Sequence, residues 1–273
     1  MLVHPDPSLV ERFKQVLNDE HSSEQTVQDF LESNPRLFHA PHELNHGIHL
    51  ELLISKFKLD TSLTTDFMYL TKSSAEWWCV LVELEHPGKK LFTNSAIQSA
   101  PLTAAIAQVR TWRTFISQHA LEVVRKLDPI RKPLSQNRVR FKYVLVIGRT
   151  EEFKADQAKV NAFAELQEAD FRVLTYDSFI HAYEQKPGTE LDVLSQRGQK
   201  YGFKVRNRAD TDVFSWLSCN DLELTPNDVD ELRGLGYEID AWLSGKALTV
   251  AWGKKVRDPS LGLSQLLRPT DQA

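Results

Sequence analysis

Cysteine and long apolar runs are both scarce in this chain of 273 residues. Its two cysteines, Cys79 and Cys219, give no disulfide framework, so we expect the reducing environment of the cytoplasm. The longest apolar runs, residues 77–82 and 143–147, are far shorter than the roughly 20 residues that span a bilayer. The N-terminal residues contain no apolar stretch typical of a secretory signal. The sequence therefore predicts a cytoplasmic protein without a membrane partner.

An excess of one charge is also absent. The chain has 33 basic and 37 acidic residues, a formal net charge of −4, which argues against a protein that coats nucleic acid through its overall charge. A hydrophobic content of 41% at this length provides for a sizeable core, in one large domain or two small ones. The glycine-rich patterns of phosphate-binding loops, dinucleotide-binding loops and nucleophile elbows are missing, which excludes three large enzyme classes.

Hydrophobic spacing predicts an α/β fold, with a mixed sheet flanked by helices. Two helices are expected first, over residues 8–19 and from about Ser23 to Asn34, where Pro35 ends the second one. An antiparallel meander and a strand–helix–strand unit follow. The expected strands are 49–54, 63–70, 77–85, 143–147 and 171–176, and the later helices are 102–120, 155–169, 225–232 and 239–243.

The strand over residues 77–85 is apolar on both faces up to Val82, as in a central strand covered on both sides. It ends with Glu83 and Glu85, which share one face because side chains alternate. With the preceding turn centred near Ser74, Asp66 on the neighbouring strand faces residues 82–83, so we expect Asp66 and Glu83 to converge within cross-strand distance. Buried carboxylates need compensation, and a hard divalent cation such as Mg²⁺ or Mn²⁺ is a natural partner. The spacing alone also fits a solvated strand end without a metal.

Seven segments in this order resemble the Shedu family of antiphage nucleases, within the PD-(D/E)XK superfamily that has a restriction-endonuclease-like core. They are residues 30–38, Asp66, 82–87, 91–93, 107–112, 143–149 and 175–179. The resemblance implies a nuclease domain over residues 23–185, preceded by an N-terminal helical segment (1–22). It does not extend to a small C-terminal module (186–273), whose boundary is marked by Pro187-Gly188.

The resemblance also implies roles for five acidic and amide side chains. Asp66 and Glu83 would be metal ligands, Glu32 an accessory acid on the first helix, and Gln108 an auxiliary group after the core strands. Glu85 stands where the family core usually has lysine. Three explanations stay open: Glu85 adds to the metal shell, a lysine arrives from elsewhere, or the site has lost activity. The nearest candidate lysines in sequence are Lys89 and Lys90.

A local basic stretch contrasts with the acidic whole. Residues 125–142 contain seven basic residues and one acid, a net charge of +6. Such a stretch fits contact with a phosphate backbone, although charge runs are more often solvated loops. Together with cations beside the other motifs, it gives the expected nucleic-acid-binding residues, which are Lys89, Lys90, Arg110, Arg113, Arg131, Lys132, Arg138 and Arg140.

Four histidines within residues 39–49 are the main competing signal. A zinc site needs three or four converging ligands, and Pro41 and Gly47 interrupt any helix that could align them. A polar loop is therefore the better interpretation.

We predict metal-dependent cleavage or nicking of DNA in bacterial defence, with RNA left open as a substrate and a homo-oligomer expected. The alternatives are a catalytically silent nucleic-acid-binding or sensor module that keeps the fold, and an interaction scaffold without a nucleic-acid role. Because a free nuclease would harm its host, some form of restraint is implied.

Overall fold

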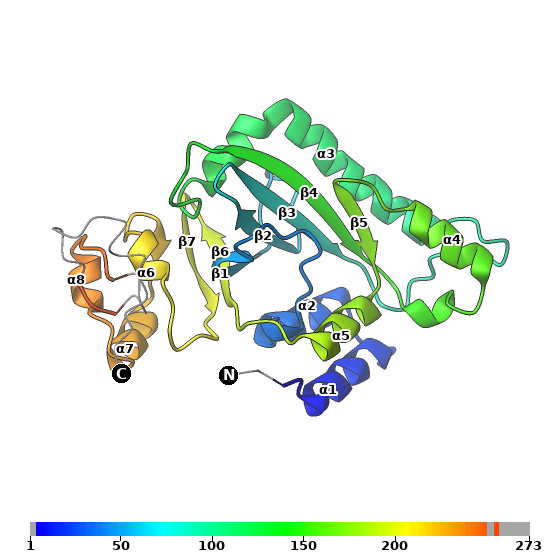
Figure 1. Ribbon diagram of the computed structural model, residues 1–273, viewed down its shortest axis with the longest axis horizontal. Helices are drawn as coiled ribbons and strands as arrows, with labels where there is room; N and C mark the ends of the chain where they lie inside the picture. The colour runs from blue at the N-terminus through cyan, green and yellow to red at the C-terminus, as the bar shows by residue number, and fades with distance from the viewer. Residues whose placement is uncertain (1–3, 250–253, 257–273) are drawn as a thin grey trace.

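The computed structural model describes residues 4–249 and 254–256, and it confirms an α/β fold in which helices flank a mixed sheet of eight strands (Figure 1). The ends of the expected N-terminal segment and C-terminal module, residues 1–3, 250–253 and 257–273, lie outside the described residues. Within the described ranges, no helix is long and apolar enough to cross a membrane.

Both expected N-terminal helices are present. Helix α1 (Pro7–Asn18) is capped by Asp6, whose side chain accepts a hydrogen bond from the backbone of Ser8. Helix α2 (Glu24–Ser33) starts at a capping box made by Ser23. A short 3₁₀ turn, η1 (Pro35–Leu37), follows where proline stops α2. Local capping chemistry thus sets where each helix begins and ends.

Strands β1 (Ile48–Ser55), β2 (Phe67–Lys72) and β3 (Glu76–Leu84) form the expected antiparallel meander. The second strand begins later than predicted, because residues 56–66 form a hairpin beyond the sheet. Its two arms are joined by a hydrogen bond from Lys56 N to Asp66 O and by a bridge between Lys58 and Thr64. We call residues 56–66 the hairpin extension.

Helix α3 (Ala100–Leu127) and strand β4 (Arg138–Val146) follow the meander. Helix α3 extends seven residues beyond its predicted end, and β4 starts five residues before its predicted start. The basic stretch 125–142 is therefore divided between a helix end, a loop and a strand. Next come η2 (Thr150–Glu152), α4 (Gln157–Glu165), β5 (Phe171–Leu174) and α5 (Tyr176–Gln185). Strands β3, β4 and β5 are parallel, as the strand–helix–strand pattern predicts.

Three more strands continue the same sheet after α5. They are β6 (Asp192–Arg197), β7 (Lys200–Val205) and β8 (Leu222–Glu223), and the full order is β5-β4-β3-β2-β1-β6-β7-β8. Strand β6 runs parallel to β1. The boundary expected at residue 186 thus falls inside one continuous sheet. Three short helices lie beyond β7: α6 (Val213–Trp216), α7 (Pro226–Gly234) and α8 (Ile239–Leu243).

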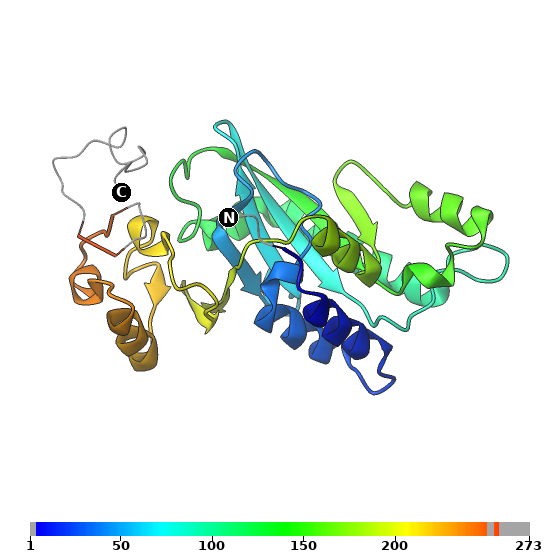
Figure 2. The ribbon, with the colours of Figure 1, turned by 60° about the horizontal axis from the view of Figure 1, so that its bottom comes forward.

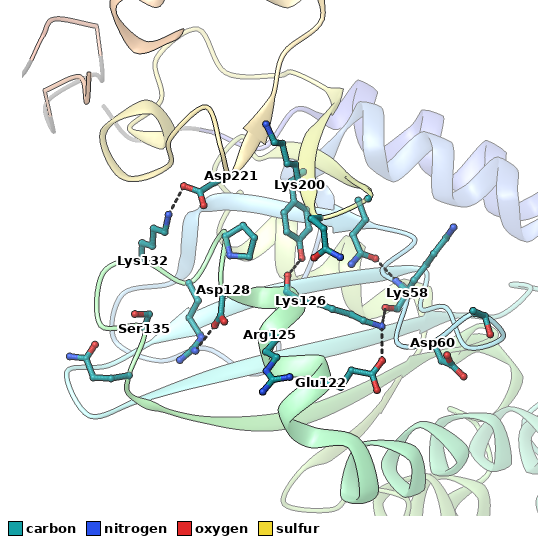
Figure 3. A pocket seen from close by; sticks show the side chains of 18 residues that line it. Lys58, Asp60, Glu122, Arg125, Lys126, Asp128, Lys132, Ser135, Lys200 and Asp221 are labelled. Carbon is teal, nitrogen blue, oxygen red and sulfur yellow. Dashed lines mark hydrogen bonds and ion pairs between the residues drawn. The ribbon is translucent and has the colours of Figure 1, made fainter. Parts of the chain in front are cut away.

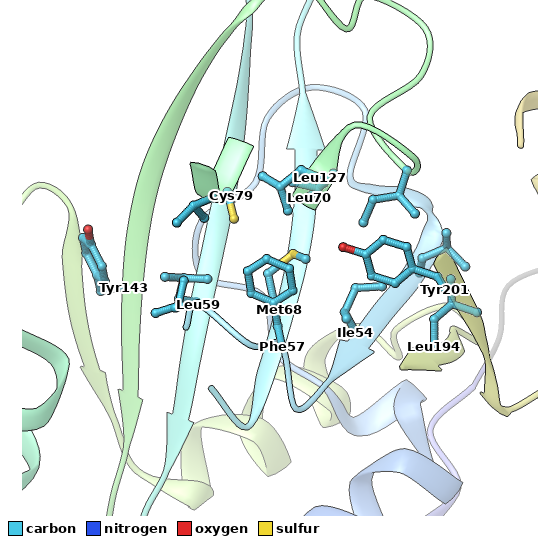
Figure 4. Close-up of a cluster of buried hydrophobic side chains, with 14 of the residues drawn as sticks. Ile54, Phe57, Leu59, Met68, Leu70, Cys79, Leu127, Tyr143, Leu194 and Tyr201 are labelled. Carbon is cyan, nitrogen blue, oxygen red and sulfur yellow. The ribbon is translucent and has the colours of Figure 1, made fainter. Parts of the chain in front are cut away.

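The sheet has a hydrophobic core on each face. Figure 1 shows α3 on one face of the sheet and α1, α2 and α5 on the other. In the turned view of Figure 2 the same three helices again lie side by side. Strand β3 contributes to both cores, with Trp77, Cys79 and Leu81 under α3 and Val80 and Val82 under the N-terminal helices. Figure 4 shows side chains of the first core, which come from β1, β2, β3, β4, β6 and β7 and are joined by Leu127 of α3. This alternation confirms the prediction of a strand covered on both sides.

Candidate functional site

Glu83 near the end of β3, Glu85 just after that strand and Asp66 just before β2 lie together at one end of these two central strands. Phe67 pairs with Val82, so Asp66, one residue before Phe67, lies beside the end of β3 that carries Glu83. The backbone N–H of Asp66 donates to Val82 O at 3.1 Å, and its Oδ2 accepts from Leu84 N at 2.7 Å. Main-chain pairing therefore fixes Asp66 beside the end of β3 without help from a ligand.

Glu83 is a buried acid in an acidic neighbourhood. Its side chain and that of Glu85 belong to residues that are each 8% exposed. Burial first, and then the charges of Asp66 and Glu85, raise the pKa of Glu83 to about 9. Oε1 accepts a hydrogen bond from the amide of Gln108 on α3, whereas the buried Oε2 has no partner within the described chain. An oxygen in this state is a natural ligand for a cation.

A lysine that the sequence did not single out completes this side of the site. Lys56, the first residue of the hairpin extension, places Nζ 2.6 Å from Oδ1 of Asp66. Its charge is one of the influences that lower the pKa of Glu83, against the larger effect of burial. The only available sequence signal is that Lys56 follows a strand end directly, which is too common to be informative.

A second lysine reaches the site from the loop after β3. Lys89 pairs with the carboxylate of Glu85 and, at 2.9 Å, with Oε1 of Glu24 at the start of α2. Glu24 also accepts the backbone N–H of His86 at 3.0 Å. Burial raises the pKa of Glu85, and the hydrogen bond from Lys89 opposes that rise. Glu24 is thus an acid of this site that the sequence did not reveal.

The structure places Glu32 in a separate cluster. Its residue is 2% exposed, and its carboxylate accepts hydrogen bonds from Ser55 Oγ at 2.6 Å, Gln28 Nε2 at 3.1 Å and Lys204 Nζ at 2.8 Å. Gln28 Nε2 lies 3.4 Å from Asp66 O, so the cluster touches the backbone of the site but not its carboxylates. The role implied for Glu32 in catalysis stays a prediction.

The donor set fits a hard divalent cation. It offers carboxylate oxygens, an unpartnered buried oxygen on Glu83 and an excess of negative charge. Within residues 4–249 and 254–256, no group of three or more His, Cys, Asp or Glu side chains is arranged to hold a metal by itself. Mg²⁺ is commonly held by one or two carboxylates plus water and substrate phosphate, so the pair Asp66 and Glu83 matches its needs.

The eight cations expected to bind nucleic acid are spread over several elements, and ion pairs already engage five of them. Arg113 pairs with Glu168 and Asp170, Arg131 is buried against Asp128, and Lys132 pairs with Asp221. The others so engaged are Arg140, with Glu76, and Lys89. The remaining three are exposed and have no ion pair in the described part of the chain; they are Lys90, Arg110 and Arg138.

Two of the four clustered histidines are core residues rather than members of a polar loop. His42 and His49 are both buried, and their rings pack edge-on against Trp78 and Trp77. Burial lowers their pKa values, to about 4 for His42 and about 3 for His49. Both rings are therefore neutral at physiological pH and fill space beside the central strand.

The fold and the site together define a mixed α/β protein that gathers acids and lysines at one edge of its central strands. Residues 21–180, more than half of the chain, match the protein family described as Shedu protein SduA, C-terminal. The chain belongs to the Shedu family, and this membership indicates a role in antiphage defence. No match was found among curated proteins.

Proposed function

We propose that this protein is a metal-dependent nuclease with a restriction-endonuclease-like core, which cleaves or nicks DNA during defence against phage. One observation carries the proposal. The carboxylate of Glu83 is buried, crowded by Asp66 and Glu85, and keeps one oxygen without a hydrogen-bond donor in the described chain. Such a costly arrangement is expected where a cation and a phosphate complete the site.

Asp66 and Glu83 would hold Mg²⁺ or Mn²⁺, and Glu85 would supplement them. When bound, such an ion activates water for attack and offsets charge that develops on the phosphate. Gln108 orients Glu83 through its amide, and Leu84 N–H orients Asp66. These contacts hold the acids in place before substrate arrives, which removes reorganisation from the reaction.

Two lysines are available for the role that the family assigns to the residue replaced by Glu85. Lys89 contacts Glu85 itself, and Lys56 contacts Asp66. Either ammonium group can orient a water or approach a phosphate oxygen, because both belong to partly exposed side chains. Lys89 is our preferred candidate, since it reaches the carboxylate that stands in the lysine position.

The same two ion pairs favour a second candidate function. They neutralise Asp66 and Glu85 without any metal, so the site is partly self-compensated. A catalytically silent module that binds nucleic acid would need no more than this. Such a module would bind nucleic acid without a metal ion, so an experiment with and without metal can distinguish it from the nuclease.

A nicking assay separates the two functions. Supercoiled plasmid and linear DNA are incubated with the full chain in Mg²⁺, Mn²⁺ or EDTA, beside Glu83→Gln and the exposed control Glu151→Gln. A nuclease nicks only with metal, and Glu83→Gln loses at least about a hundredfold of that rate while Glu151→Gln keeps it. DNA binding without nicking in any metal supports the silent module and overturns the enzyme.

A further inference from the structure

A polar groove borders the hairpin extension and contains none of the carboxylates of the acidic site in its lining. It has a volume of about 1050 Å³ and is lined by the hairpin extension, the C-terminal end of α3, the loop that follows α3 and the turn between β6 and β7 (Figure 3). We call it the α3-end groove. Lys126 is one of the lining residues, and its ammonium group links α3 to the hairpin extension by donating to Leu59 O at 2.7 Å.

Most acidic side chains that line this groove are engaged in ion pairs. Asp128 is taken by Arg131, Asp221 by Lys132, and Glu122 lies 3.6 Å from Lys126. Asp60 is the remaining acid of the lining. Three lining cations have no ion pair among the described residues, namely Lys58, Arg125 and Lys200. The groove thus keeps an uncompensated positive charge on a protein whose net charge is −4.

These three cations come from three different elements. Lys58 belongs to the hairpin extension and Arg125 to the end of α3, and both are exposed. Lys200 begins β7, where its ammonium group donates to Cys219 O at 2.9 Å, a neutral acceptor that leaves its charge in place. Figure 3 shows the three side chains spread around the groove rather than pointing at one spot. A single phosphate could meet only one of them, whereas a chain of phosphates could meet all three.

We propose that the α3-end groove binds the phosphodiester backbone of a nucleic acid, through Lys58, Arg125 and Lys200. The choice of nucleic acid among polyanions rests on the function proposed above, but binding here requires neither metal nor cleavage. The hairpin extension carries Lys56 and Asp66 at its base and Lys58 near its tip. It therefore places a backbone contact close to the acids that would act on the same polymer.

Fluorescence anisotropy with a labelled 30-base-pair duplex, in EDTA and over a range of NaCl, tests the groove. Each phosphate contact contributes about 0.9 to the slope of log Kd against log salt. The triple variant Lys58→Gln, Arg125→Gln, Lys200→Gln is expected to lower that slope by about 2 to 3 and to weaken binding at least about tenfold. Melting temperatures confirm that each variant is folded.

The matched control changes the same charge at three exposed cations outside the groove and the acidic site, Arg12, Lys154 and Lys246. It should keep the wild-type slope within about 1. Equal losses in both triple variants, or no loss in the groove variant, overturn the proposal. Equally effective competition by polyglutamate, charge for charge, also overturns it in favour of an acidic protein partner. Binding is measured in EDTA, where metal-dependent cleavage cannot occur. If the separate nicking assay with metal shows no cleavage while groove binding is intact, the nuclease proposal fails and the groove proposal stands.

Discussion

Lys204 and Glu32 form an ion pair at 2.8 Å although 172 positions separate them in the sequence. The pair joins β7 to α2 across the end of β1, because Ser55 Oγ also donates to Glu32. It connects the C-terminal half of the sheet to the layer that covers the N-terminal half. A buried carboxylate in such a place is stabilised only while its donors remain.

Replacing Lys204 with Met should destabilise the fold. The loss leaves Glu32 buried with one donor fewer, at a cost of about 1 to 3 kcal/mol in the free energy of unfolding, reduced by the 35% exposure of the Lys204 side chain. Urea denaturation measures it. The double variant with Glu32→Gln should cost less than the two single variants together. Nicking should stay within about threefold; a large loss with an intact fold would instead support the catalytic role implied for Glu32.

Replacing Glu83 with Gln should raise stability while it abolishes nicking. Ionisation of Glu83 is unfavourable in the folded protein, so wild-type stability falls as pH rises from about 4.5, the pKa of an unperturbed glutamate, to about 9. The amide removes that cost, and we expect a gain of about 1 to 3 kcal/mol at pH 7 in EDTA. The carbonyl oxygen of the introduced amide can still accept a hydrogen bond from Gln108. Reduced stability at pH 7 would show that the crowding of acids is not costly.

Mg²⁺ should stabilise the wild-type protein and not Glu83→Gln. A ligand that binds only the folded state raises the melting temperature, by the equivalent of about 2.7 kcal/mol at 100 times its dissociation constant. Differential scanning fluorimetry with and without 10 mM MgCl₂ checks this, with Glu151→Gln as an exposed control. An equal shift in all three proteins would place the binding elsewhere.

Replacing Asp192 with Asn should change how stability depends on pH. Asp192 starts β6 and is fully buried, and burial raises its pKa to about 6. The folded state therefore holds a proton more tightly than the unfolded state, so this residue makes stability fall as pH rises from about 4 to 6. Asparagine keeps an oxygen for the backbone N–H groups of Asn207 and Arg208. Relative to wild type, the variant should gain about 2 kcal/mol between pH 4 and pH 7 in urea titrations.

Adding a methyl group at Gly148 should disturb the loop that carries Lys89. Gly148 follows β4 with φ of +63°, and a Cβ there would lie 2.6 Å from Lys89 O and against the side chain of Leu91. Gly148→Ala should cost about 1 to 3 kcal/mol and reduce nicking. Gly47→Ala is the matched control, because φ is +64° and its Cβ would meet no described atom within 4 Å. Equal effects in both variants would mean that backbone strain alone is responsible.

The acidic pair could be predicted from sequence because its geometry is local. A turn near Ser74 and the alternation of β3 predict which residues of the two strands lie opposite each other, and the observed register pairs Phe67 with Val82, next to Asp66 and Glu83. The helix starts at Ser23 and Thr225 could also be predicted, because capping residues and prolines act over only a few positions. In each case a short-range rule was sufficient.

Other parts depend on contacts that no local pattern encodes. Strand β6 pairs with β1 about 140 positions away, and nothing in either segment specifies the partner. Lys56 and Glu24 join the site only because β1, β2 and α2 are packed together. The first half of β4 was not predicted because it belongs to the basic stretch. Arg138 and Arg140 alternate there with partly buried neighbours, and so polar a sequence is typical of a loop.

Helix α3 spans both proposed contact points. Gln108, near its start, touches Glu83, and Arg125, near its end, borders the groove. At 1.5 Å per residue these positions are at most about 25 Å apart along the axis, with a non-helical residue at His119 between them. That length corresponds to about seven base pairs of duplex. Helix α3 would therefore set the distance between the acidic site and the α3-end groove. Affinity should rise in a step once an oligonucleotide is long enough to contact both.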